Sequence, residues 1–252
     1  MTRPYVTLSC AMSLDGYLDT EAPQRLALSN AEDFDRVDRL RAQCDAIMVG
    51  ASTVRRDDPR LLVRSEDRRM LRLGAGRQAS PLKVTVTASG KLSPESSFFR
   101  AGDVDKIVYC PGPEADRIAS DLGAVATVVG LGDEVTMRAL VDDLGARGVR
   151  RLVVEGGGRI HTQFLVEGVA DELQLVVAPF FVGEPRAPRF VAPGSFPWTA
   201  ERRARLAETR QIGDVVLLRY ALSDRFEAEG MLDAREVEPP IPALARHHGH
   251  ES

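Results

Sequence analysis

The stretch Leu152-Val153-Val154-Glu155-Gly156-Gly157-Gly158-Arg159 decides how this chain folds. Its apolar, β-branched residues predict a buried strand, and the three glycines predict a tight break that opens a helix. A strand that ends in glycines before a helix brings backbone N–H groups and the positive end of the helix to one point. That arrangement suits a phosphate, especially a dinucleotide pyrophosphate. The pattern is not the G-x-G-x-x-G fingerprint, so a purely structural turn is the alternative.

Strands and helices alternate on both sides of this stretch. Strands are predicted at residues 6–12, 45–50, 82–87, 105–110, 124–129, 150–155 and 173–178. Helices are predicted from the capping box at residues 29–32 to Cys44, and at residues 114–122, 133–147 and 159–168. Residues 204–211 and 215–222 have the spacing of a hairpin. We therefore predict an α/β fold with a mostly parallel central sheet flanked by helices and a C-terminal antiparallel hairpin.

The remaining segments complete the predicted domain. Residues 51–64 are predicted to be turn-rich, and residues 65–81 to be an exposed excursion. Residues 1–222 show no break in composition and are predicted to form one domain. Residues 223–252 are acidic and contain prolines, so we expect a tail that is flexible or packs on a partner and adds little to the core.

The composition excludes several classes of protein. A net charge of −4 argues against nucleic-acid binding, because nucleic-acid binders usually carry a basic excess. The chain has no apolar run near the roughly 18 to 20 residues that span a bilayer, and its start lacks a signal-peptide pattern. We expect a cytoplasmic protein without a membrane partner. Cys10, Cys44 and Cys110 include no C-x-x-C pair, which predicts reduced thiols and no structural zinc site.

Histidines are few in this sequence. His161 is the only one before the tail, where His247, His248 and His250 form an H-H-G-H cluster. We interpret the cluster as a terminal tail and predict no metal site there. A catalytic triad would have to rely on His161 alone, which argues against that mechanism.

Acidic and basic residues near predicted strand ends are candidates for ligand contacts. Glu155 closes its strand beside the glycines and could accept hydrogen bonds from ring N–H groups, or it could be a salt-bridge partner. Arg41, Arg60 and Arg64 are candidate anion ligands, because a guanidinium binds phosphate in a two-point fork; solvated surface positions are the alternative. The segments Asp57-Asp58-Pro59 and Asp15-Gly16 predict turns that could also place a carboxylate beside a ligand.

Several of these segments, taken in order, resemble one family. They are Arg3-Pro4-Tyr5, Ser13-Leu14-Asp15-Gly16, Leu40-Arg41-Ala42, Asp45-Ala46-Ile47, Val49-Gly50-Ala51-Ser52-Thr53-Val54, Asp57-Asp58-Pro59-Arg60-Leu61, Val154-Glu155-Gly156-Gly157-Gly158, Asp171-Glu172-Leu173 and Ala178-Pro179. Together they are similar to the reductase domain of the riboflavin-biosynthesis deaminase–reductase, the 5-amino-6-(5-phosphoribosylamino)uracil reductase family. The similarity covers about residues 3 to 221.

The resemblance implies a dihydrofolate-reductase-like fold, NADPH as the hydride donor, a phosphorylated small-molecule substrate and a homodimer. The residues implied at the cofactor are Ala11, Thr53, Asp57, Gly157, Gly158, Arg159 and Ile160, with the segment 157–163 at its phosphates. Those implied at the substrate are Arg41, Leu61, Arg64 and Glu155. Hydride would reduce the ring-opened ribosylamine to a ribitylamine. Asp57 or Asp15 is a candidate proton donor, and water is an equal contender.

This chain also departs from the bacterial pattern of that family. Ser9 stands where the bacterial enzymes carry a lysine, Arg25 where they have a serine, and Ala27 near a tryptophan position. The zinc motifs of a deaminase, H-x-E and P-C-x-x-C, are absent from the sequence, which predicts a stand-alone reductase. A same-fold reductase of a pterin-like, folate or imine substrate is one alternative, and a non-catalytic nucleotide-binding protein is another. Arg55, Arg56 or Lys91 could meet the 2′-phosphate of NADPH.

Overall fold

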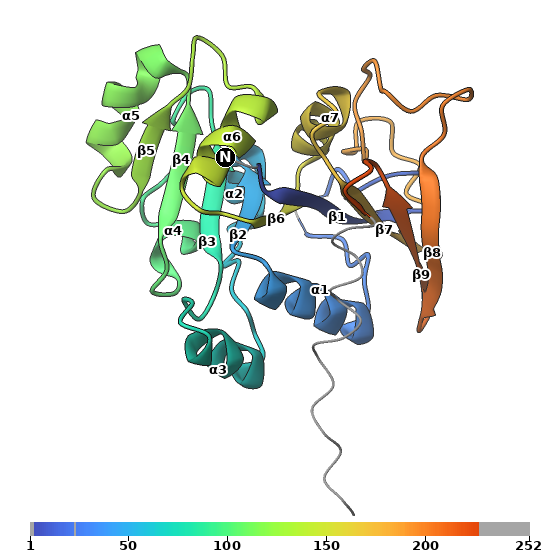
Figure 1. Cartoon of the computed structure of the whole chain (residues 1–252). Helices are drawn as coiled ribbons and strands as arrows, with labels where there is room; N and C mark the ends of the chain where they lie inside the picture. Colours follow the sequence, from blue (N-terminus) through green and yellow to red (C-terminus); the bar gives the residue numbers. More distant parts are fainter. Residues whose placement is uncertain (1–2, 23, 227–252) are drawn as a thin grey trace, which may run out of the picture.

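A nine-stranded sheet forms the centre of the molecule in the computed structural model, which describes residues 3–22 and 24–226 (Figure 1). The strand order is β5-β4-β3-β2-β6-β1-β7-β9-β8. The strands are β1 (Tyr5–Ser13), β2 (Ala46–Gly50), β3 (Leu82–Val86), β4 (Lys106–Cys110), β5 (Thr127–Gly130), β6 (Arg151–Gly156), β7 (Glu172–Ala178), β8 (Arg205–Ile212) and β9 (Val215–Ala221). In this order, every neighbouring pair from β5 to β7 is parallel. The last two pairs, β7 with β9 and β9 with β8, are antiparallel. The prediction of a mostly parallel sheet with a C-terminal hairpin is confirmed.

Helices cover both faces of the sheet. They are α1 (Ala31–Gln43), α2 (Ala51–Asp57), α3 (Glu66–Gly74), α4 (Ser97–Arg100), α5 (Ala115–Leu122), α6 (Met137–Ala146) and α7 (Gly158–Val166), with a 3-10 turn η1 (Gly112–Glu114) before α5. On one face, Val154 packs with α6 and α7 in a large apolar cluster. On the other face, Val153 packs with α1, α2, α4 and α5. Alternation along β6 therefore points Glu155 toward the α1 face.

An opening forms in the sheet where β1 separates from β6. These strands pair only from Tyr5–Arg151 to Leu8–Val154, whereas β1 continues beside β7 as far as Ser13. After β1 the chain continues to β2, which lies on one side of β1 in the sheet. It later returns through β6, next to β1, and continues to β7 on the opposite side of β1. Ligands of open α/β sheets bind beyond the carboxyl ends of strands at such points. The topology alone places a site beside Ser9, Ala11 and Glu155.

The glycine turn after β6 has the predicted form, and close packing explains it. Gly157 caps α7 with φ of +90°, a conformation that favours glycine. A Cβ on Gly158 would lie 2.2 Å from the carbonyl oxygen of Arg189, so the backbone at residues 189–190 requires a glycine there. Ile160 packs against Gly50, where an added Cβ would lie 2.7 Å from its Cγ1.

Two predictions for local structure were incomplete. Residues 51–64 contain a helix as well as irregular chain, because α2 follows directly on β2 and buries Ala51 and Val54. Residues 65–81 are largely exposed, as predicted, but they contain helix α3, which Ser65 caps by accepting a hydrogen bond from the Arg68 N–H. Arg72 on α3 is buried and donates to the carbonyl oxygens of residues 42, 44 and 78. These bonds fasten α3 to the end of α1.

The end of the described chain packs on the sheet. Arg225 donates to the Asp171 carboxylate and to the carbonyl oxygen of Pro4. Phe226 lies under the guanidinium groups of Arg205 and Arg219. The rest of the predicted tail, with its histidine cluster, lies outside the described residues. Cys10, Cys44 and Cys110 are free thiols, as predicted.

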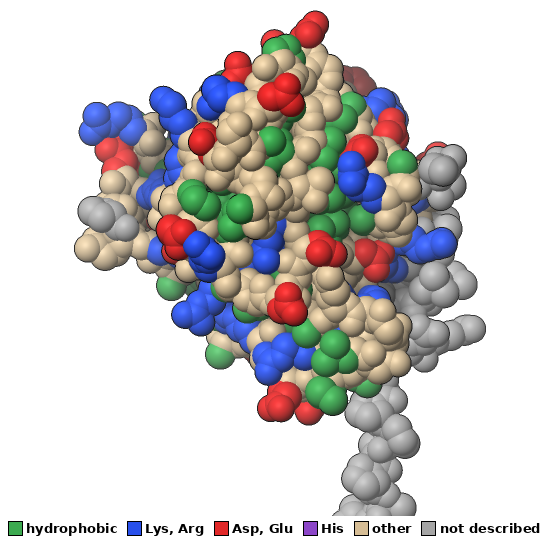
Figure 2. Space-filling model, turned by 90° about the vertical axis from the view of Figure 1, so that its left-hand side faces the viewer, with side chains coloured by type: hydrophobic (Ala, Val, Ile, Leu, Met, Phe, Trp, Pro, Cys, Tyr) green, Lys and Arg blue, Asp and Glu red, His purple; other side chains and the backbone are tan. Residues whose placement is uncertain are grey.

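Surface charges on the face beside α5 and β5 are mixed (Figure 2). Lys and Arg side chains alternate there with Asp and Glu, and some form ion pairs, such as Arg117 with Glu114 and Arg100 with Glu95. This face therefore carries charges of both signs. Within the described ranges, none of the helices combines the length and apolar character that a membrane span requires.

Candidate active site

Two adjoining cavities lie at the carboxyl ends of β1, β2 and β6. The first has a volume of about 360 Å³ and lies between β1, α1, α2 and the end of β6. The second, of about 390 Å³, lies between α2, the start of α7 and the segment 188–193. The residues that line both are Leu18, Asp19, Thr53, Asp57 and Gly157. The site therefore suits an elongated ligand in the second cavity whose end meets a second molecule in the first.

Glu155 and Arg41 form a two-point ion pair in the first cavity. Arg41 Nε lies 2.7 Å from Glu155 Oε1, and Nη2 lies 2.6 Å from Oε2. The side chain of Arg41 is only 14% exposed and that of Glu155 only 11%. Arg41 Nη1 also donates to the Leu62 carbonyl. Burial alone would lower the pKa of Arg41, but the charge and hydrogen bonds of Glu155 raise it. Arg41, predicted as a phosphate ligand, therefore has its guanidinium bound to Glu155 in this structure.

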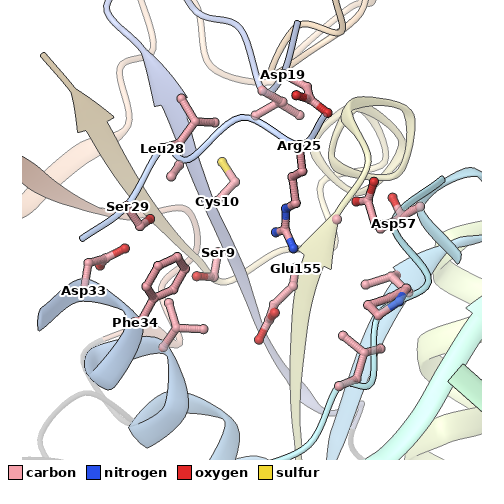
Figure 3. Close-up of a pocket in the computed structure, with 18 of the residues that line it drawn as sticks. Ser9, Cys10, Asp19, Arg25, Leu28, Ser29, Asp33, Phe34, Asp57 and Glu155 are labelled. Atoms are coloured by element: carbon pink, nitrogen blue, oxygen red, sulfur yellow. The ribbon is translucent and has the colours of Figure 1, made fainter. Parts of the chain in front are cut away.

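Arg64 and Arg25 are the basic side chains that face the first cavity without a described ion pair. The Arg64 guanidinium lies 5.4 Å from the centre of the Phe34 ring, while its backbone N–H is fixed by Asp38. Figure 3 shows Arg25 extending from its loop into the cavity, between Asp57 and Glu155. Arg60, the third arginine that the sequence suggested, lines neither cavity.

The two aspartates proposed as proton donors have different surroundings. Asp57 lines both cavities at the end of α2, where burial raises its pKa against the opposing effect of Arg25. Asp15 lines neither cavity; its carboxylate accepts hydrogen bonds from Ser13 Oγ and from the N–H groups of Val182 and Gly183. Desolvation opposes these bonds, yet they hold the pKa of Asp15 below its usual range. The geometry therefore favours Asp57.

The other predicted residues fall into four groups. Thr53 and Gly157 line both cavities, Ala11 and Leu61 line the first, and Gly158 and Arg159 line the second. Leu61 is buried with φ of +48°, so its backbone is held in the left-handed region. Ile160 lines neither cavity: its N–H donates to Gly157 and its side chain packs in the core. The prediction that it contacts the cofactor is not supported by this position.

The sequence interpretation missed several residues of the site. Phe34 on α1 is 41% exposed and lines the first cavity. Arg189 lines the second cavity, with its guanidinium 4.4 Å from the centre of the Tyr17 ring. His161, set aside for lack of partners, lines the first cavity. No local motif marks these positions, because each reaches the cavity through contacts between segments that are far apart in the sequence.

Comparison with known proteins agrees with this geometry. Residues 4–218 match the family model described as the RibD C-terminal domain. The chain belongs to this family. It is 34% identical over 225 residues to the 2,5-diamino-6-ribosylamino-4(3H)-pyrimidinone 5′-phosphate reductase of Archaeoglobus fulgidus. The matched region covers 89% of this chain and 99% of that relative.

Further relatives carry the same or a similar description. The enzyme of that same name from Methanothermobacter thermautotrophicus is 34% identical over 181 residues, covering 72% of this chain and 80% of the relative. A pyrimidine reductase-like protein from Corynebacterium diphtheriae has a similar structure, with a TM-score of 0.72 at 22% identity, covering 86% of this chain and 91% of that one. The RibD-type resemblance drawn from the sequence motifs is confirmed. As a member of this reductase family of riboflavin biosynthesis, the chain is an oxidoreductase and uses a nicotinamide cofactor.

Proposed function

We propose that this RibD-type reductase uses NADPH to reduce 2,5-diamino-6-ribosylamino-4(3H)-pyrimidinone 5′-phosphate, or its deaminated relative 5-amino-6-(5-phosphoribosylamino)uracil. The observation that carries the proposal is the meeting of two cavities at Thr53, Asp57 and Gly157. One cavity begins at a glycine turn and a helix N-terminus, and the other contains a fixed carboxylate and two arginines that have no ion pair among the described residues. Such an arrangement brings two ligands into reacting contact, and holding them there supplies much of the lowering of the barrier.

The second cavity fits a dinucleotide. The turn at Gly157 and Gly158 presents the N-terminus of α7 to it, and backbone N–H groups at a helix start favour a pyrophosphate. Bound NADPH supplies a hydride to the substrate. Arg159 lines this cavity without an ion pair or side-chain hydrogen bond among the described residues, whereas Arg56 pairs with Asp19 at 3.0 Å. We therefore assign the 2′-phosphate to Arg159, in place of the earlier candidates Arg55, Arg56 and Lys91.

The first cavity fits a pyrimidine with a phosphorylated sugar. Glu155, held by Arg41, presents an oriented carboxylate that can accept hydrogen bonds from ring N–H or amino groups. Arg64 is the proposed phosphate ligand because its guanidinium carries no ion pair within the described ranges. Asp57 stands where the two cavities meet, and its raised pKa favours a protonated carboxyl that can deliver a proton to the opening sugar oxygen.

Arg25 favours a second candidate substrate class. Its side chain enters the cavity at a position where the bacterial enzymes carry serine (Figure 3), and Ser9 and Ala27 also line this space. The additional positive charge of Arg25 changes which anionic substrates the first cavity can bind. A same-fold reductase of another pterin-like or imine substrate is therefore the alternative. We also expect a cytoplasmic homodimer with the dihydrofolate-reductase-like fold, in which residues 1–222 form the reductase domain.

The test measures NADPH oxidation at 340 nm with each pyrimidine and with dihydrofolate. We expect turnover of at least one pyrimidine phosphate and none of dihydrofolate; comparison of the two pyrimidines decides which one is preferred. Turnover of dihydrofolate alone would support the alternative. Intact NADPH binding without turnover of any of the three would overturn the assigned substrate, and a failure to bind NADPH would overturn the reductase assignment for this cavity. Light scattering of the purified full chain tests the dimer.

A further inference from the structure

His161 is a buried histidine whose two ring nitrogens have no hydrogen-bond partner among the described residues. Its side chain is fully shielded from solvent in the described chain. A neutral imidazole has one donor and one acceptor, and nearly all buried polar groups in native proteins are satisfied by a partner. The hydrogen-bonding capacity of this ring is therefore left for a group that the described residues do not supply.

The position of His161 shows where such a group would come from. The residue lies in the first turn of α7, and its N–H donates to the Gly157 carbonyl at 3.1 Å. His161 lines the first cavity together with Cys10 and Ala11, which lie on the stretch of β1 that has separated from β6. The Phe190 ring packs near the imidazole, with 5.9 Å between the ring centres. His161 thus lies beside the opening between the strands.

The charge state of the ring restricts the class of ligand. Burial lowers the pKa of His161 to about 4, so the imidazole is neutral near pH 7. A phosphate or carboxylate would favour the protonated ring, which burial opposes. A neutral donor–acceptor pair is instead complementary to a primary carboxamide, which offers one acceptor oxygen and a donor NH₂ group.

We propose that His161 is a ligand-binding residue that hydrogen-bonds the carboxamide of the nicotinamide ring and so orients that ring at the opening between β1 and β6. This inference rests on the proposed function. A dinucleotide whose pyrophosphate lies at Gly157 must pass its nicotinamide end from the second cavity into the first, and His161 borders the first cavity only. Its role is to orient the ring, because a neutral imidazole with a pKa near 4 is a poor proton donor to substrate.

Two variants of the full chain test the proposal. His161→Phe keeps a flat buried ring but removes both nitrogens, and His161→Gln restores a donor and an acceptor. Dissociation constants are measured by fluorescence for NADPH, and by calorimetry for 2′-phospho-ADP-ribose, which lacks nicotinamide. Val166→Ala, on the exposed part of α7 outside both cavities, is the control.

We expect His161→Phe to weaken NADPH binding on the order of tenfold, as the loss of about one hydrogen bond implies. Binding of 2′-phospho-ADP-ribose should change less than about twofold on the same scale, and His161→Gln should recover part of the NADPH affinity. Unchanged NADPH affinity with raised thermal stability would mean an unsatisfied core histidine and overturn the proposal. Equal losses for both ligands would also overturn it, because the effect would then not depend on the nicotinamide.

The wild-type protein gives a second measurement if His161→Phe does not fold. Nitrogen-15 NMR of the imidazole, assigned with His161→Gln, should show a change at one or both ring nitrogens with NADPH and none with 2′-phospho-ADP-ribose. An identical spectrum with both ligands would contradict the proposal. A protein that binds neither ligand would instead contradict the proposed function itself, which keeps the two failures distinguishable.

Discussion

Arg41 on α1 and Glu155 at the end of β6 form a two-point ion pair across 114 positions of sequence. The pair exists because the alternation along β6 turns Glu155 toward the α1 face, where the last turn of α1 presents Arg41. Arg41 was predicted as an anion ligand, and Glu155 as either a ligand group or a salt-bridge partner. Their pairing fixes the carboxylate in one orientation at the edge of the cavity.

Breaking this pair should cost stability. Arg41→Ala leaves the mostly buried carboxylate of Glu155 without its partner, so we expect a loss of about 3 kcal/mol in the free energy of unfolding, the lower end for buried pairs. Urea denaturation measures it. Arg60→Ala, at an exposed position outside both cavities, is the control and should change the same quantity by less than about 0.5 kcal/mol. Equal stability of Arg41→Ala and Arg60→Ala would contradict a stabilising role for the Arg41–Glu155 ion pair.

Arg64 should bind the substrate phosphate. Arg64→Ala removes a charge-assisted contact of about 2 kcal/mol, so we expect KM for the pyrimidine phosphate to rise on the order of thirtyfold with a smaller change in kcat. Inhibition by ribose 5-phosphate should weaken in parallel. Arg60→Ala again serves as the matched control. If Arg64→Ala retained the wild-type KM while Arg25→Ala raised it, the phosphate would belong to Arg25.

Asp57 should determine how the rate falls as the pH rises. A carboxyl whose pKa is raised by burial stays protonated to higher pH, and its ability to donate a proton is lost as the pH rises through that pKa. We expect Asp57→Asn to lower kcat on the order of 100-fold and to remove this dependence. Asp15→Asn should keep the wild-type pH profile, because Asp15 holds the backbone at residues 182 and 183. Unaltered kcat in Asp57→Asn would assign the proton to water.

The parts of the fold that follow from local pattern were predictable. The β6–glycine–α7 unit was evident because apolar periodicity and three glycines are both encoded within eight residues. Helix α3 was missed although Ser65, Glu66 and Asp67 form an N-cap and an acidic first turn, because the many charges that follow suggested an exposed loop. Its buried face depends on Arg72, a charged residue that hydropathy counts as exposed.

The parts of the site that depend on tertiary crossings were not predictable. Gly158 is a glycine because the Arg189 carbonyl lies against it, and sequence gives no sign of that approach. Thr53, Asp57 and Glu155, which the family resemblance implied as ligand contacts, line the first cavity. The resemblance could not show that Arg41 is bound to Glu155, or that Arg25 and His161 face the same space, because these contacts depend on side-chain directions specific to this chain.

Arg159 should determine the preference for NADPH over NADH. It lines the second cavity and has no ion pair within the described ranges, so we expect it to bind the 2′-phosphate. Arg159→Ala should raise KM for NADPH on the order of tenfold and leave KM for NADH unchanged within about twofold. Arg186→Ala is a suitable control, because Arg186 pairs with Glu21 away from both cavities. Equal effects on NADPH and NADH would place Arg159 at the pyrophosphate.

His161 should make the folded state sensitive to acid. In the unfolded chain a histidine has a pKa near 6.5, whereas burial lowers the pKa of His161 to about 4 in the folded chain. As the pH falls through this interval, the unfolded state takes up a proton that the folded state does not, so the free energy of unfolding decreases. One pKa unit corresponds to about 1.4 kcal/mol, and the full loss is therefore roughly 3 kcal/mol.

The loss should be absent from His161→Gln, whose side chain does not titrate. The difference in free energy of unfolding between wild type and His161→Gln should shift by up to roughly 3 kcal/mol in favour of the variant from pH 7.5 to pH 4, with most of the change below pH 6.5. Chemical denaturation at several pH values measures it, and the comparison cancels the titration of carboxylates common to both proteins. A difference that stays constant over this interval would mean that His161 becomes protonated as readily in the folded chain as in the unfolded one, and therefore that the ring is open to water or to an acidic partner.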